Sequence, residues 1–204
     1  MRTLIVTAHP DTGSLTHHAA RRLQEELGAD RTTLAHLAQE GFDPRFAAGD
    51  RRDYLERTLT DPAVAAEQAR IDAADHLVLV FPVYWWSLPA LLKGWIDRVF
   101  VGGWAFGFDD EDRVVPWLDR LTLHLLPLSG TSAASFARHG YDRAFTTQVE
   151  EGIVDFCGMR RGARAFVHDS ESTDREAVGA AVETAVASVV AAITGAGRTT
   201  TIAG

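Results

Sequence analysis

The stretch that decides the fold is His76-Leu77-Val78-Leu79-Val80-Phe81-Pro82-Val83-Tyr84-Trp85-Trp86-Ser87-Leu88-Pro89. Its first half is apolar without alternation, and strands of that kind are covered on both faces, as in a parallel sheet. Open parallel sheets bind their ligands just beyond the carboxyl ends of the strands. The aromatic residues after Val80 therefore predict the floor of a site for a flat ligand. Trp85 and Trp86 could instead fill a gap between a helix and the sheet, since large aromatic residues dominate core burial.

Length and composition predict one compact α/β domain. The chain has 204 residues, 46% of them hydrophobic, and a chain of this size can bury a full core. A formal net charge of −8 disfavours nucleic-acid binding, which needs a concentrated basic face. The lone cysteine, Cys157, excludes an internal disulfide and is expected in the core. Without a signal-peptide core or an apolar run of membrane length, the sequence predicts a cytoplasmic protein with no membrane insertion.

Strand-like and helix-like segments alternate along the chain. The predicted strands cover residues 3–8, 32–37, 76–80, 121–128 and 163–168, and the predicted helices cover 15–27, 63–74, 90–100, 143–156 and 175–193. Residues 42–58 are expected to form a surface excursion. Five strands with interleaved helices predict a flavodoxin-like, doubly wound parallel sheet of order 2-1-3-4-5. We expect a single domain over residues 1–193 and a flexible C-terminal tail over 194–204.

This strand order predicts one site built from three loops. They cover residues 9–16, 82–87 and 129–135, and they meet where the first and third strands lie side by side. The first loop precedes a helix N-terminus, where unpaired N–H groups favour a phosphate, although it could be an ordinary capping turn. The third loop offers hydroxyls and Gly130, or it could be a tight strand–helix turn. His17 and His18 are expected to face solvent, and no metal site is predicted because adjacent helical residues do not share a face.

A long segment carries a family resemblance. Residues 81–100 read Phe81-Pro82-Val83-Tyr84-Trp85-Trp86-Ser87-Leu88-Pro89-Ala90-Leu91-Leu92-Lys93-Gly94-Trp95-Ile96-Asp97-Arg98-Val99-Phe100. They resemble the signature of the flavodoxin-fold NAD(P)H:quinone oxidoreductases, the DT-diaphorase family with its bacterial drug-modulator and potassium-efflux ancillary relatives. The resemblance extends to Ala8-His9-Pro10 with Ser14, to residues 103–108 and to Phe156-Cys157-Gly158, and covers about residues 2–168.

The resemblance implies a flavin, FAD or alternatively FMN, with NAD(P)H as co-substrate. The flavin phosphates would lie on the first loop and the ring against the second, with its pyrimidine edge facing the third. The implied cofactor-binding residues are His9, Ser14, Leu15, Thr16, Pro82, Val83, Tyr84, Trp85, Trp86, Ser129, Gly130 and Thr131. The implied reaction is a two-electron ping-pong cycle in which NAD(P)H and then a quinone or related acceptor stack on the same flavin face.

The resemblance also implies a homodimer with shared active sites. Phe106 and Phe108 would line the pocket of the other subunit, and an exposed aromatic face of this kind is more often a contact or ligand wall than bare surface. The expected substrate-pocket residues are Trp86, Phe106, Phe108 and Phe136.

The sequence departs from the family where a proton must reach the quinol. Backbone N–H groups of Gly130 and Thr131 are expected to stabilise the negative charge of the reduced flavin. The family's best-studied members carry a tyrosine and a histidine after this loop, but Phe136 stands where the tyrosine would be, and His139 or Tyr141 could substitute. Residues 42–60 also form a shorter excursion than in mammalian members, where it helps hold the adenine end of FAD. FAD is preferred here, with FMN open.

Two other kinds of protein fit the same residues. One is a regulatory flavoprotein subunit that docks on a membrane transporter, and the other is a flavodoxin-like one-electron carrier. Saturable reduction of quinones by NAD(P)H would exclude the carrier, because a carrier needs no open substrate pocket.

Overall fold

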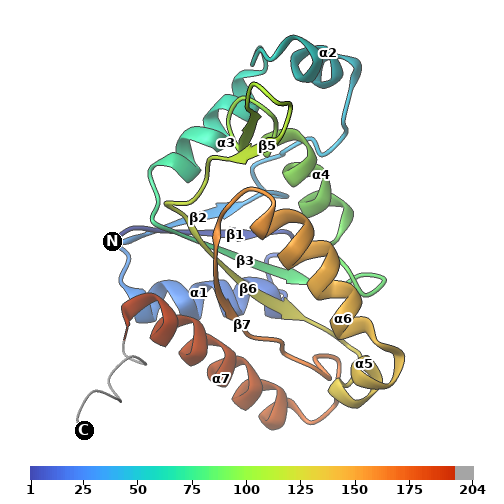
Figure 1. The fold of residues 1–204 in the computed structure, drawn as a ribbon. Coiled ribbons are helices and arrows are strands. Elements are labelled where there is room, and N and C mark those ends of the chain that lie inside the picture. Colours follow the sequence, from blue (N-terminus) through green and yellow to red (C-terminus); the bar gives the residue numbers. More distant parts are fainter. Residues whose placement is uncertain (196–204) are drawn as a thin grey trace, which may run out of the picture.

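A five-stranded parallel sheet forms the centre of the molecule (Figure 1). The computed structural model describes residues 1–195. The sheet has the order β2-β1-β3-β6-β7 and consists of β1 (Thr3–Thr7), β2 (Thr32–His36), β3 (His76–Pro82), β6 (Thr122–Leu128) and β7 (Arg160–Arg164). This is the predicted flavodoxin-like order, with β6 and β7 as its fourth and fifth strands. The predicted order is therefore confirmed.

Helices cover both faces of the sheet (Figure 1). In chain order they are α1 (Leu15–Leu27), α2 (Ala48–Glu56), α3 (Pro62–Asp72), α4 (Ala90–Val99), α5 (Ala133–His139), α6 (Tyr141–Phe145), the π-helix η1 (Thr146–Asp155) and α7 (Arg175–Thr194). Alternate side chains of β3 point to opposite faces of the sheet. Val78 and Val80 pack with α1 and α7, whereas Leu77, Leu79 and Phe81 pack on the opposite side with α3, α4 and η1. The unbroken apolar run of β3 is thus buried on both faces, as its sequence indicated.

Helix α7 is long and apolar enough, by length and composition, to cross a membrane, with a mean hydropathy of 1.8. Core helices meet the same criterion. Its buried residues Val182, Val186 and Val189 belong to the cluster that includes Ala19 and Leu23 of α1. The apolar character of α7 is therefore used to cover the sheet.

The surface excursion predicted at residues 42–58 contains a helix, α2, that the sequence did not indicate. An ion-pair network holds it in place rather than an apolar face. Arg98, which is 8% exposed, donates to the Asp50 carboxylate at 2.8 Å and to the Asp43 carbonyl at 2.7 Å, and it also pairs with Asp61. Asp53 accepts the Thr60 N–H at 2.8 Å just after the helix.

The aromatic segment at residues 104–108 forms part of a small hairpin outside the main sheet. Strand β4 (Phe106–Phe108) pairs antiparallel with β5 (Val114–Pro116), a strand that the sequence did not indicate. Residues 106–108 are therefore extended, whereas Trp104 and Ala105 lie in the turn before β4. In Figure 1 the hairpin lies at the end of the molecule that also carries α2.

Two segments after β6 differ from the prediction. The loop predicted at residues 129–135 already contains the start of α5, capped by Ser132 and ended by Gly140 at φ 70°. Strand β7 covers Arg160–Arg164, earlier than the predicted 163–168, because its pairing with β6 shifts register between Leu123 and Leu125. The predicted residues still follow β6, since the Val167 N–H donates to the Pro127 carbonyl at 2.9 Å. The tail predicted at 194–204 lies outside the described residues from 196 onward.

Candidate functional site

The three predicted loops meet at the carboxyl edge of the sheet, and backbone hydrogen bonds join them. The Ala8 N–H donates to the Val80 carbonyl at 3.4 Å, which links the first loop to β3. The Val83 N–H donates to the Leu128 carbonyl at 2.7 Å, which links the second loop to the end of β6. Since β1, β3 and β6 are neighbours, one surface carries all three segments (Figure 1).

The first loop presents hydrogen-bond donors at the start of α1. Ser14 caps the helix, its Oγ accepting the His17 N–H at 3.4 Å. The Leu15 and Thr16 N–H groups make no hydrogen bond to any residue within 1–195. His9 accepts the Asp11 N–H on Nδ1 at 3.0 Å, so a neutral His9 ring carries its proton on Nε2 and can donate from there. This end of α1 can therefore bind an anion such as a phosphate.

His17 is buried beneath this loop, and the prediction that it faces solvent is wrong. It is 2% exposed, and its Nε2 donates to the His9 carbonyl at 3.2 Å. Its ring stacks on His36 at 4.6 Å, and His36 Nδ1 lies 2.7 Å from the Thr7 hydroxyl. Burial lowers the pKa of His36. Only His18 is exposed as predicted, so His17 acts as a support that fixes the loop from below.

The second loop is a tight turn whose two central residues are tryptophans. Tyr84 and Ser87 close it with reciprocal backbone hydrogen bonds of 3.2 and 3.1 Å. Trp85 and Trp86 have φ angles of 49° and 58°, a left-handed conformation that such turns normally give to glycine or asparagine. Trp85 is 87% exposed, so it does not fill a gap between a helix and the sheet. Strained backbone of this kind is most often retained at functional sites.

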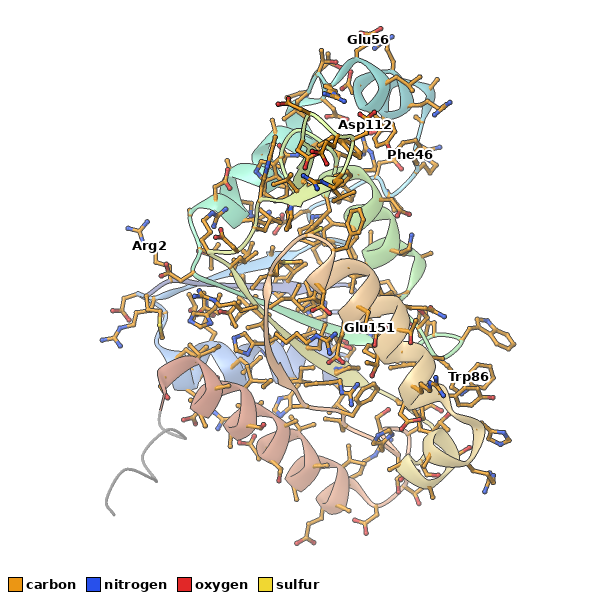
Figure 2. The ribbon with its side chains drawn as sticks, viewed as in Figure 1. Arg2, Phe46, Glu56, Trp86, Asp112 and Glu151 are labelled. Carbon is orange, nitrogen blue, oxygen red and sulfur yellow. The ribbon has the colours of Figure 1, made fainter. Side chains whose placement is uncertain are left out.

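Beside this turn, aromatic rings are layered on one another. Trp86 stacks on Tyr141 at 4.3 Å, and Tyr141 stacks on His139 at 5.4 Å (Figure 2 labels Trp86 beside α5 and α6). Phe136 packs edge-on under Tyr141 at 5.8 Å and is only 2% exposed. The structure thus brings His139 and Tyr141 to the expected site, but Phe136 lies beneath the surface rather than in the wall of an open pocket.

The third loop keeps one backbone donor available. Ser129 is 2% exposed, and its Oγ accepts the Thr131 N–H at 3.0 Å, so the expected role of that N–H toward a ligand is not supported. The Gly130 N–H makes no hydrogen bond to a described residue. A Cβ at Gly130 would lie 2.9 Å from the Glu171 carboxyl carbon, so a larger residue here would require the exposed Glu171 side chain to move. His168 Nδ1 lies 3.0 Å from the Thr131 carbonyl and holds the other side of the loop.

Phe106 and Phe108 lie far from these loops in the same chain. Phe106 packs against Phe156 at 5.0 Å, at the end of η1, whereas Tyr141 begins α6 at the other end. A continuous helical segment of this length spans roughly 20 Å. Figure 2 agrees, since Asp112 of the β4–β5 turn lies in the upper part of the molecule and Trp86 in the lower half. A site that contained all of these residues would need two chains.

A family model described as a flavodoxin-like fold matches residues 1–190. Ribosyldihydronicotinamide dehydrogenase [quinone] of Mus musculus is 29% identical over 184 residues, covering 78% of this chain and 78% of that protein. NAD(P)H dehydrogenase [quinone] 1 of Rattus norvegicus is 33% identical over 180 residues, covering 78% of this chain and 65% of that protein.

Solved structures agree on the fold. The NAD(P)H:quinone oxidoreductase of Methanothermobacter marburgensis superimposes with a TM-score of 0.82 at 21% identity, covering 92% of this chain and 96% of that one. An FMN-dependent NADH-azoreductase of Bacillus anthracis, solved with FMN, has a TM-score of 0.68 at 15% identity, covering 92% of this chain and 97% of that one. Together with the two mammalian relatives, these matches confirm the predicted family resemblance.

Proposed function

Because the chain belongs to the flavodoxin-like fold family, we propose that it is a flavin-dependent NAD(P)H dehydrogenase of the quinone type, reducing quinones or similar acceptors. Its mammalian relatives are named as quinone-linked dehydrogenases. One observation carries the proposal: an anion-binding helix end, an exposed indole and an unpaired backbone donor share one edge of the sheet. These are the three features that a phosphate-bearing, flat and partly polar cofactor needs.

The residues present fit a flavin. The unpaired N–H groups of Leu15 and Thr16, with His9 Nε2, would hold its phosphate, and Trp85 with the half-buried Pro82 and Val83 would face its ring. A bound flavin would supply the two-electron hydride chemistry. The chain contributes the Gly130 N–H, which would donate to the pyrimidine edge of the ring, where negative charge gathers on reduction.

Tyr141 is our candidate for the proton donor to the reduced acceptor. Its ring is fixed between Trp86 and His139, and Phe136 supports it from below. His139 is exposed at the end of α5, so its position is less constrained. A donor must stay within hydrogen-bond reach of the reacting oxygen, which favours the residue with the fixed ring.

We propose FAD, with FMN as the alternative, and a cytoplasmic homodimer in which Phe106 and Phe108 line the partner's pocket. The separation of these phenylalanines from Trp86 supports a shared site. Phe108 is 42% exposed and Trp117 47%, so a partner subunit would cover apolar surface that one chain leaves open.

Purification followed by flavin extraction and anaerobic titration with NADPH tests the proposal. We expect a yellow protein with about one flavin per chain, which NADPH bleaches and a quinone re-oxidises. A protein that stays colourless after incubation with FAD and with FMN would contradict it. A flavin that NADPH cannot reduce would instead favour the regulatory subunit or the one-electron carrier.

A further inference from the structure

A cavity lies at the amino edge of the sheet, opposite the edge that carries the three loops. Its volume is about 530 Å³, within the ~300–1,000 Å³ of small-molecule sites. It is lined by the first residues of β3, β6 and β7 and by the last turn of α7. The described residues that line it are Met1, His76, Thr122, His124, Arg160, Arg161, Gly162, Ala163, Ala192 and Ile193. None of these is acidic, although the whole chain carries a net charge of −8.

Two histidines form a hydrogen-bonded chain that ends in this cavity. The Ala163 N–H donates to His124 Nδ1 at 3.0 Å, so the proton of neutral His124 sits on Nε2. That nitrogen lies 2.9 Å from His76 Nδ1, which must therefore accept. The neutral His76 ring then carries its proton on Nε2, its remaining nitrogen. Burial lowers the pKa of the fully buried His124 to about 4, which keeps it neutral at pH 7.

Gly162 leaves the space that the His124 ring occupies in this chain of hydrogen bonds. A Cβ on Gly162 would lie 2.4 Å from His124 Nδ1, so a side chain at this position would displace the ring. The buried ring sits where the β6–β7 pairing shifts register, and it satisfies the Ala163 N–H there. The direction of the hydrogen bonds is thus set by the backbone, and His76 offers a donor rather than an acceptor.

Arg160 supplies a positive charge beside His76. Its Nε donates to the Thr122 hydroxyl at 3.2 Å and its Nη2 to the Arg120 carbonyl at 2.7 Å, which fixes the guanidinium and leaves Nη1 for a ligand. No carboxylate among residues 1–195 lies within ion-pair distance of Arg160. Its neighbour Arg161, by contrast, is neutralised by Asp155 and Glu150.

We propose that this cavity binds a small organic anion. Its carboxylate or phosphate group would accept hydrogen bonds from Arg160 and from His76 Nε2–H, and its apolar part would lie against Ala192 and Ile193. A metal ion fits less well, because residues 1–195 place no group of three or more His, Cys, Asp or Glu side chains together to hold one. This site is separate from the loops of the proposed enzyme, so it binds a ligand of its own.

Calorimetric titration of the purified, flavin-loaded protein with hexanoate and with hexyl phosphate tests the proposal and separates the two anion types. Arg160→Gln should weaken binding of the preferred probe about tenfold or more, since it removes a charge-assisted hydrogen bond. Side-chain ¹⁵N NMR should show a shift of the His76 Nε2 signal on saturation. Inorganic phosphate should bind more weakly than hexyl phosphate, because it cannot use the apolar wall.

Arg161→Gln is the matched control, because it removes a neighbouring arginine that is already paired. Its affinity for the probe should stay within about twofold of that of the unmodified protein. Equal losses in the two variants would overturn the proposed contacts and show a response to net charge alone. A His76 signal that neither probe shifts at ~10 mM would overturn the site. Melting curves and flavin absorbance must match in both variants, since Arg160 is an exposed residue away from the flavin loops.

Discussion

At the scale of single residues, Tyr141 offers a direct test of proton delivery. Tyr141→Phe keeps the ring that stacks on Trp86 at 4.3 Å and removes only the hydroxyl. If that hydroxyl is the proton donor, kcat for quinone reduction should fall about 100-fold while flavin content stays unchanged. His139→Gln is the control, and it should alter kcat less than about twofold. A large loss in the His139 variant alone would transfer the role to the histidine.

The strained backbone at Trp85 should lower the free energy of unfolding. Its φ of 49° is strained for any side chain, and the indole is 87% exposed, so little burial is lost on removal. Trp85→Gly should raise the free energy of unfolding by about 1 kcal/mol, measured by urea denaturation without flavin. Trp85→Ala removes the same ring but keeps the strain, so it should give no such gain. Both variants should bind flavin more weakly, and equal unfolding energies would show that the turn is unstrained.

His124 makes the stability of the fold depend on pH. Burial, and then the neighbouring His76, lower its pKa from 6.5 to about 4. Between these values the unfolded chain binds the proton and the folded chain does not, so stability falls as the pH drops from about 6.5 toward 4. The loss is at most about 3 kcal/mol. His124→Asn keeps an acceptor for the Ala163 N–H without this titration, and urea unfolding at pH 7 and pH 5 should show a smaller pH dependence.

The prediction that His17 faces solvent is wrong, and the spacing between His17 and the buried residues of α1 shows why. His17 lies three and six residues before the buried Ala20 and Leu23, on the face of α1 that covers the sheet. His18 is adjacent to His17 in the sequence but points in a different direction, because adjacent helical residues do not share a face. Thr7 and His36, which complete the support, come from separate strands and could be found only from the strand order.

At the scale of elements, apolar periodicity decided what could be predicted. Helix α1 has the predicted bounds because its buried Ala19 and Leu23 repeat at helical spacing and its caps are Ser14 and Gly28. Helix α2 buries only Asp53 and depends on the distant Arg98, so it has no local apolar signal. Strand β7 was misplaced because its register depends on the ring of His124, a contact between chain segments about 40 residues apart.

Helix α4 packs so closely against the backbone at Pro44 that Gly94 has no room for a side chain. A Cβ there would lie 2.2 Å from the Pro44 carbonyl oxygen, a backbone atom that cannot rotate away. Gly94→Ala should therefore lower the unfolding free energy by about 1–3 kcal/mol. Gly179→Ala on α7 is the control: a Cβ there has no neighbour within 4 Å, so helix propensity should stabilise by about 0.5–1 kcal/mol. Opposite signs in thermal melts would confirm the close approach.

At the scale of the whole molecule, a shared site predicts complementation between defective chains. Sedimentation should give about twice the 22.2 kDa chain mass. Tyr141→Phe and Phe108→Ala chains should each be impaired as homodimers, but a mixed dimer contains one site free of both changes. Co-expression in equal amounts should restore about a quarter of full activity, since about half of the dimers are mixed. If mixed dimers form but activity is not restored, Tyr141 and Phe108 act in the same site of one chain.

The fold of the whole molecule was more predictable than its site. The unbroken apolar run of β3 and the alternation of elements specify the sheet order, and that order alone brings the three loops together. Details within each loop depend on contacts that no local pattern encodes. The engagement of the Thr131 N–H by Ser129 and the layering of Tyr141 on Trp86 are two such contacts.

Cys157, the lone thiol, is buried at 3% exposure at the end of η1, and burial raises its pKa to about 11. Thiolates, not thiols, are what peroxide and alkylating reagents attack. The native protein should therefore not react with maleimides. An engineered cysteine at Asp110, on the β4–β5 turn, would be the sole reactive handle for a fluorophore or spin label, and the spacing between two such labels would report directly on how two copies assemble.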